Sequence, residues 1–208
     1  YKRQDKNSLQ MPTCHIGLPP IQDSPESIIS MAKTLGIETI YVPAVPESER
    51  KQSSEGWKKL GESLEEAAKP ILDSGLQMGW HNHAFEFAVT EDGDLPLDLI
   101  LSSAPSLSLE LDIAWAVIGK HDALQTVNKY ADRLSAAHIK DIAATGECSD
   151  EDGWADVGYG TMDWQTLVNR LLELDIKNLV MEHDNPKDHE RFASRSIETV
   201  NKLAGAQK

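Results

Sequence analysis

The chain has 208 residues, of which 40% are hydrophobic and 26% are charged, and this is enough for one globular domain with a substantial core. A formal net charge of −14 opposes binding to nucleic-acid phosphate or to an anionic membrane surface, both of which attract basic proteins. No apolar stretch approaches the roughly 20 residues of a membrane-spanning helix, and two widely separated cysteines, Cys14 and Cys148, indicate reduced thiols.

Short β-like runs alternate with helical runs along the whole chain. We expect strands at residues 9–16, 37–42, 75–83, 107–112, 134–139 and 178–182. Helices are expected at residues 24–35, 55–74, 96–102, 121–130, 164–174 and 188–204, because apolar positions there keep helical spacing or start signals precede them. Strands separated by helices predict a parallel sheet. The long acidic segment 145–160 is expected to be a loop over the end of that sheet.

Polar side chains stand at or just beyond the ends of four predicted strands. They are Glu86, Asp112, His138 and Glu182. In a parallel α/β barrel the carboxyl ends of all strands open onto one mouth, so these four side chains are expected to converge there. Each one alone could simply cap a helix or pair with a neighbour, but four in succession favour one divalent-metal site. Carboxylates and imidazole suit Mn²⁺, our preferred ion, and also Mg²⁺, Co²⁺ or Zn²⁺.

Further residues near these strand ends are candidates for contact with a substrate. His81 and His83 alternate along one strand, so their side chains are expected on the same side; they either line the mouth or form a hydrogen-bonded core pair. Lys140 shares the side of His138 and needs a negative partner, which Asp112, Glu182 or a substrate oxyanion could supply; the alternative role is a purely structural ion pair. Trp115, expected in a loop, could stack on a sugar or pack that loop, and His15 ends the first strand.

Five motifs in order along the chain resemble those of the sugar phosphate isomerase/epimerase family, the xylose isomerase-like TIM barrels. The motifs are Trp80-His-Asn-His-Ala-Phe-Glu-Phe87, Leu109-Glu-Leu-Asp-Ile-Ala-Trp115, Ala137-His-Ile-Lys-Asp141, Val157-Gly-Tyr-Gly-Thr-Met-Asp-Trp164 and Val180-Met-Glu-His-Asp184. The departures are small: Tyr159 stands where the family often has Glu, and Trp80 where it often has Tyr.

The resemblance implies a (β/α)8 TIM barrel. In such proteins the His-Asn-His strand is the fifth of eight, so the six strands here would be the third to the eighth, and the first two βα units would be absent from this chain. We therefore expect a single TIM-barrel domain over residues 1–208.

The expected activity is that of a metal-dependent isomerase or epimerase acting on a sugar or keto-sugar through an enediolate. Glu86 and Glu182 would transfer the proton, with His83 as the alternative base, and Lys140 would stabilise the oxyanion. His81, Trp115 and His15 would bind substrate.

Other activities remain open at this point. A lyase acting on a keto-inositol or a 3-keto-glycoside would use the same site, and a non-catalytic sugar-binding barrel is a further alternative. A metal-dependent endonuclease of the same fold fits poorly with the negative charge. We expect a small sugar as partner, no nucleic acid, no membrane, and a homo-oligomer as one option. The polar start of the chain carries no secretory pattern, so a cytoplasmic location is expected, although a segment with a targeting signal could precede Tyr1.

Overall fold

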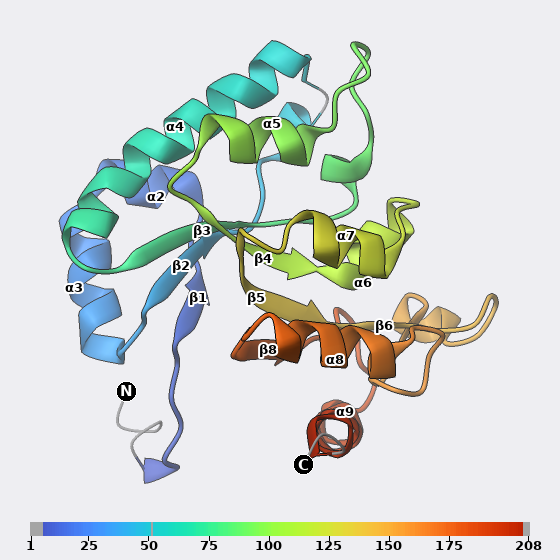
Figure 1. The fold of residues 1–208 in the computed structure, drawn as a ribbon. Coiled ribbons are helices and arrows are strands. Elements are labelled where there is room, and N and C mark those ends of the chain that lie inside the picture. The colour runs from blue at the N-terminus through green and yellow to red at the C-terminus, as the bar shows by residue number, and fades with distance from the viewer. Residues whose placement is uncertain (1–5, 51, 206–208) are drawn as a thin grey trace. The chain divides into compact units, whose positions relative to one another are not determined.

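The structure is a computed structural model that describes residues 6–50 and 52–205. It divides into two compact units, one ending at Glu110 and the other beginning at Leu111 (Figure 1). A single domain over residues 1–208 stays a prediction.

The first unit is built on parallel strands that neighbour one another in chain order. They are β1 (Thr13–His15), β2 (Thr39–Val42), β3 (Gln77–His81) and β4 (Ser108–Asp112), the last of which runs two residues into the second unit. Between them lie α2 (Leu18–Asp23), α3 (Pro25–Leu35), η1 (Glu47–Glu49), α4 (Ser54–Asp73), η2 (Phe85–Phe87) and α5 (Pro96–Ser103).

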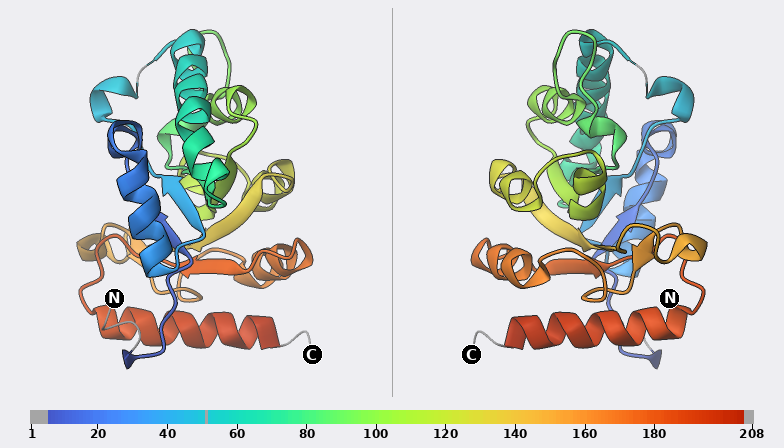
Figure 2. Two further views of the ribbon diagram at one scale, coloured as in Figure 1. Left: turned by 90° about the vertical axis from the view of Figure 1, so that its left-hand side faces the viewer. Right: turned by 90° about the vertical axis from the view of Figure 1, so that its right-hand side faces the viewer.

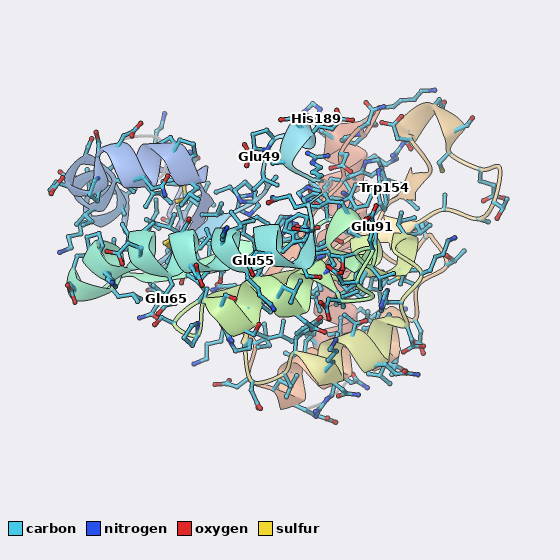
Figure 3. All side chains as sticks on the ribbon, turned by 90° about the horizontal axis from the view of Figure 1, so that it is seen from above. Glu49, Glu55, Glu65, Glu91, Trp154 and His189 are labelled. Carbon is cyan, nitrogen blue, oxygen red and sulfur yellow. The ribbon has the colours of Figure 1, made fainter. Side chains whose placement is uncertain are left out.

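The long helix α4 shows why these segments fold as they do. The side chain of Ser53 caps its first turn by accepting a hydrogen bond from the Gly56 amide at 3.3 Å. Apolar residues at helical spacing are buried where α4 packs against β3 and α5, among them Trp57, Leu64 and Ile71. Glu55 lies on the exposed side of the helix, whereas Glu65 is half-buried and accepts hydrogen bonds from Ser106 beyond α5 (Figure 3).

The second unit contains a parallel pair formed by β5 (Leu134–Ile139) and β8 (Asn178–Met181). A separate antiparallel pair joins β6 (Asp141–Ile142) to β7 (Trp154–Ala155). The helices are α6 (Ile113–Ile118), α7 (Ala123–Lys129), η3 (Ser149–Glu151), α8 (Trp164–Glu173) and α9 (His189–Gly205). The long terminal helix α9 packs against α8 (Figure 2).

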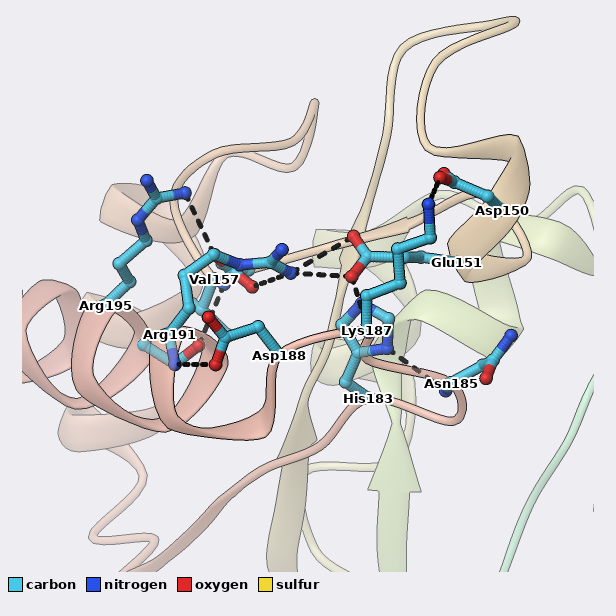
Figure 4. Close-up of polar contacts among 11 residues, drawn as sticks. Asp150, Glu151, Val157, His183, Asn185, Lys187, Asp188, Arg191 and Arg195 are labelled. Carbon is cyan, nitrogen blue, oxygen red and sulfur yellow. Dashed lines mark hydrogen bonds and ion pairs between the residues drawn. The ribbon is translucent and has the colours of Figure 1, made fainter.

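The segment expected to be a loop, residues 145–160, is more ordered than the sequence predicts. It contains η3 and β7, and side chains of α9 hold it in place (Figure 4). Arg191 makes ion pairs with Glu151 at 2.8 Å and with Asp156 at 2.9 Å, and Arg195 binds Asp156 at 3.1 Å. These contacts join residues far apart in sequence, which is why local sequence patterns did not reveal them.

The six predicted strands and six predicted helices are all confirmed, with ends shifted by a few residues. The sequence missed two short helices: α2, which begins shortly after β1, and α6, which follows directly on β4. It also placed His83 on a strand, whereas β3 ends at His81. No helix among the described residues has the length and apolar character needed to cross a bilayer.

Candidate metal centre

Three of the four predicted metal ligands come together in the second unit. They are Asp112, His138 and Glu182, and each offers one ligand atom within 4.8 Å of the other two. Nδ1 of His138 lies 3.1 Å from Oε2 of Glu182 and 3.8 Å from Oδ2 of Asp112. Two carboxylates and one imidazole on this scale form a donor set that fits a divalent ion such as Mn²⁺ or Zn²⁺, so this His/Asp/Glu cluster could hold a metal.

Strand geometry explains why these three side chains meet. Asp112 is the last residue of β4, His138 lies in β5, and Glu182 directly follows β8. Parallel pairing sets Ile139 opposite Met181, and the Glu182 amide continues the ladder by donating to the Ile139 carbonyl at 3.2 Å. His138 and Glu182 are therefore held at the same, carboxyl-terminal end of the pair.

Asp112 also has a second role that the sequence did not reveal. Its Oδ1 accepts a hydrogen bond from the amide of Trp115 at 2.9 Å and so caps helix α6. Trp115 is thus a helical residue and not a loop residue, which corrects the expectation. The cap fixes the Asp112 carboxylate with its other oxygen directed toward His138.

The two carboxyl groups of the cluster differ in their affinity for a proton. Burial raises the pKa of Asp112 to about 7, although the positive charges of His138 and Lys140 oppose the rise. Partial burial also raises the pKa of Glu182, but a hydrogen bond and charge from His138 and the charge of Lys140 outweigh it and hold the pKa well below its ordinary range. Glu182 is therefore ionised at neutral pH, while Asp112 is poised to bind or release a proton.

Lys140 lies directly behind this cluster and is completely buried. Its Nζ lies 3.2 Å from Oε2 of Glu182 and 2.5 Å from Oδ2 of Asp184. The ammonium also sits over the rings of Trp115 and Trp154, at 4.8 Å and 4.1 Å from their centroids. Two carboxylates and two aromatic faces thus compensate the buried charge. Glu182 is one of the negative partners expected for Lys140, whereas the contact between Lys140 and Asp184 was not predicted.

The fourth predicted ligand, Glu86, belongs to the first unit and lies in η2. Its carboxyl is fully buried, with Oε1 accepting from the indole of Trp80 at 3.1 Å and Oε2 from the amide of His83 at 2.9 Å. Burial raises the pKa of Glu86 to about 8, against hydrogen bonds that lower it. Oε1 thus ties η2 to β3, and Oε2 ties it to the segment that follows β3. Metal binding by Glu86 stays a prediction.

The predicted substrate-binding histidines also lie in the first unit, around a carboxylate that the sequence analysis did not single out. Nε2 of His15 contacts Oε2 of Glu110, and Nδ1 of His81 lies 3.3 Å from the same oxygen. The ring of His83 stands edge-on to that of His81, with centroids 5.1 Å apart. The alternation of side chains along a strand could have indicated Glu110 as a candidate, because it sets Glu110 on the same side of β4 as Asp112.

A second missed residue is Asp141, the last member of the Ala137-His-Ile-Lys-Asp141 motif. Its buried carboxylate accepts hydrogen bonds from the amides of Ile142, Gly158, Gly160 and Met162, at 2.8 to 3.1 Å. A Cβ at Gly160 would lie 2.3 Å from Oδ1 of Asp141, so only glycine fits there. Two of the motifs recognised in the sequence are therefore parts of one structural unit beside Lys140.

Comparison with known proteins shows the family and the fold of this chain. A protein-family model described as xylose isomerase-like TIM barrel matches residues 23–203. An inosose dehydratase from Clostridium perfringens is 30% identical over 91 residues, which cover 43% of this chain and 30% of that protein. The match thus spans less than a third of the length of that relative.

Solved structures match over almost the whole chain. A sugar phosphate isomerase/epimerase from Parabacteroides distasonis has a TM-score of 0.77 at 20% identity, covering 98% of this chain and 73% of that one. The IOLI protein, solved with a zinc atom bound, has a TM-score of 0.69 at 16% identity, covering 94% of this chain and 76% of that one. The family match, which extends over most of the sequence, identifies this chain as a member of the xylose isomerase-like TIM-barrel family.

Proposed function

We propose that this chain is a divalent-metal-dependent isomerase or epimerase of a sugar or keto-sugar. The observation that carries the proposal is the convergence of Asp112, His138 and Glu182, with the buried Lys140 ammonium 3.2 Å from Glu182. A cluster of three protein ligands leaves coordination positions for substrate oxygens. The similarity to a sugar phosphate isomerase/epimerase supports the fold on which this proposal rests.

The reaction that suits these groups is proton transfer beside a carbonyl. A divalent cation held by the three ligands would supply Lewis-acid stabilisation of negative charge on a substrate oxygen. Glu182 and Glu86 remain our proposed pair for proton transfer. The pKa of about 8 at Glu86 suits exchange near neutral pH, whereas the low pKa of Glu182 favours its role as a ligand. His83, whose amide binds Glu86, is the alternative base.

Lys140 and the aromatic residues around it would complete the site. The Lys140 ammonium is fixed between Glu182 and Asp184, so it can stabilise an oxyanion without reorganising. Trp115 packs edge-on against Trp154, at 4.9 Å between centroids, and we propose that it presents an aromatic surface to the sugar. His81 and His15 are proposed to bind substrate hydroxyls from the first unit.

A dehydratase is the second candidate, and a specific observation favours it. The matched relative from Clostridium perfringens is an inosose dehydratase, and it is 30% identical over the 91 residues that match. Dehydration of a keto-sugar begins with the same loss of a proton beside a carbonyl and then expels water. The same residues would therefore serve both reactions.

One experiment tests the proposal and separates the two reactions. The purified protein, loaded with Mn²⁺, would be incubated with a panel of ketoses, keto-inositols and 3-keto-glycosides in D₂O and followed by NMR. An isomerase or epimerase should give an isomeric product that carries deuterium at the reacting carbon, and a dehydratase should give a product lacking one water. A protein that binds no divalent ion and exchanges no substrate proton would contradict the proposal.

A further inference from the structure

We propose that Arg191 is a positioning residue for the Lys140 ammonium. It acts through the segment of residues 148–157, which it clamps to helix α9, because the ring of Trp154 in that segment covers the ammonium. The inference rests on the function proposed above, in which Lys140 stabilises an oxyanion, and it adds a residue of α9 to the proposed site. The contacts that carry it lie in the second unit.

The first observation is that one guanidinium holds the chain on both sides of Trp154 (Figure 4). Nη2 of Arg191 donates to both carboxylate oxygens of Glu151, at 2.8 Å and 3.1 Å. Nε donates to Oδ2 of Asp156 at 2.9 Å, and Nη2 also donates to Oδ1 of Asp156 at 3.1 Å. Glu151 precedes Trp154 in the chain, and Asp156 follows it. Both carboxylates are buried, so water screens these ion pairs less than it screens pairs at an exposed surface.

The second observation is that the clamped segment has a backbone conformation that its own residues do not favour. Cys148 and Asp152, on either side of η3, have φ angles of 49° and 58°, in the left-handed region that is uncommon for residues other than glycine. Such a conformation persists where surrounding contacts fix it. Arg191 lies in the first turn of α9, and Ser196 of the same helix accepts a hydrogen bond from the Val157 amide at 3.1 Å. Helix α9 therefore fixes the position of the segment.

The third observation is the cover that Trp154 provides. Its ring centroid lies 4.1 Å from Nζ of Lys140, and the ring contacts that of Trp115 edge-on at 4.9 Å. Lys140 is completely buried, although the side chains of its partners Glu182 and Asp184 are 32% and 39% exposed. The rings thus keep water from the ammonium, and without water its charge acts more strongly on a substrate oxygen. Movement of the segment would let water reach Nζ and weaken this effect.

The test is the rate at which formaldehyde and a borane reductant methylate Lys140 in the full chain, followed by peptide mass spectrometry. Lys177, whose side chain is 79% exposed, serves as the internal reference. Lys140 should react slowly in the wild type. Arg191→Met should raise its rate relative to Lys177 by a factor on the order of 10 or more, because the rate follows the population of the opened segment. Lys187→Met removes an exposed ion pair between the same segment and Asp150's partner side chain, so it should leave the Lys140 rate unchanged.

Two further readouts separate positioning from a general loss of stability. Arg191→Lys keeps the charge and should restore part of the protection of Lys140. In protein labelled with 5-fluorotryptophan, the ¹⁹F resonance of Trp154, assigned with Trp154→Phe, should shift in Arg191→Met, whereas that of Trp57 in α4 should not. Unchanged Lys140 methylation in Arg191→Met would overturn the proposal. Equal shifts at Trp154 and Trp57 would also overturn it, because they would report a change in the whole fold.

These measurements need no substrate, so they distinguish failure of this inference from failure of the proposed function. If the experiment in D₂O finds turnover but Lys140 reacts equally fast in the wild type and in Arg191→Met, the proposed function stands and Arg191 has no positioning role. If Arg191→Met loses the protection but no substrate proton exchanges, Arg191 still positions Lys140, and the reaction assigned to the site is wrong.

Discussion

At the scale of single residues, the proposed mechanism depends on the contact between Lys140 and Glu182. Lys140→Met removes a charge but no metal ligand, so we expect it to keep its metal and to lower kcat by a factor on the order of 10² or more.

Glu182→Gln should lower kcat by a factor on the order of 10²–10⁴, with a smaller loss of metal, if Glu182 also transfers the proton. Metal content and turnover must be measured on the same samples.

Two outcomes would change these assignments. Full activity in Lys140→Met would leave only the ion pairs with Glu182 and Asp184 as the role of that lysine. Full activity in metal-loaded Glu182→Gln would move the base to Glu86 or His83.

Glu86 provides a residue-scale prediction about stability. Its pKa of about 8 in the folded protein lies above the ordinary value of 4.5, so folding favours the protonated form. The contribution of this group to stability is therefore present at low pH and is lost as the pH rises from about 4.5 to about 8. Glu86→Gln cannot ionise, so its free energy of unfolding should fall less over this range than that of the wild type.

Urea denaturation of both proteins at pH 5, 6, 7 and 8 measures this difference. Parallel curves for wild type and Glu86→Gln would show that the buried carboxyl does not titrate in the range. The metal content of Glu86→Gln, measured in the same preparation, tests whether Glu86 is a metal ligand. If the variant keeps all of its metal, Glu86 does not belong to the metal centre.

At the scale of elements, Asp141 joins β6 to the turn formed by residues 157–162. Asp141→Asn would replace an acceptor oxygen by an NH₂ group facing backbone amides, and we expect a loss of about 3 kcal/mol in the free energy of unfolding. Asp163→Asn is a matched control, because Asp163 caps α8 through one exposed hydrogen bond and Asn caps nearly as well. Equal stability of the two variants in denaturant titrations would contradict the proposed role of Asp141.

At the scale of the whole molecule, metal binding should stabilise the fold in a pH-dependent way. An ion present at 100 times its Kd stabilises a protein by about 2.7 kcal/mol. A proton on Asp112, whose pKa is about 7, competes with the ion, so affinity should fall as the pH decreases below 7. We therefore expect Mn²⁺ to raise Tm more at pH 8 than at pH 6.

The control for this prediction is Asp112→Asn, in which the effect of Mn²⁺ on Tm should be small at both pH values. A rise in Tm that is equal at pH 6 and pH 8 in the wild type would show that Asp112 does not control binding. A rise that persists in Asp112→Asn would show that the stabilising ion does not depend on the Asp112 carboxylate.

The sequence by itself determined the order of strands and helices and predicted three residues that come together in the structure and could hold a metal. Apolar spacing is a local property, so α4, α8 and the six strands could be found from it. The strand-end position of Asp112, His138 and Glu182 followed from the same pattern, because parallel strands bring their carboxyl ends together.

Only the tertiary structure decided how the remaining polar groups are used. Glu110 lies in the middle of an apolar run, and its two histidines come from strands that are distant in sequence. Three of the four amides around Asp141 are also distant in sequence, as are the arginines that bind Glu151 and Asp156. Burial raises the pKa of Asp112, whereas contacts with His138 and Lys140 outweigh burial and lower the pKa of Glu182. Such effects depend on distances between segments, and the residue pattern within a single segment does not contain them.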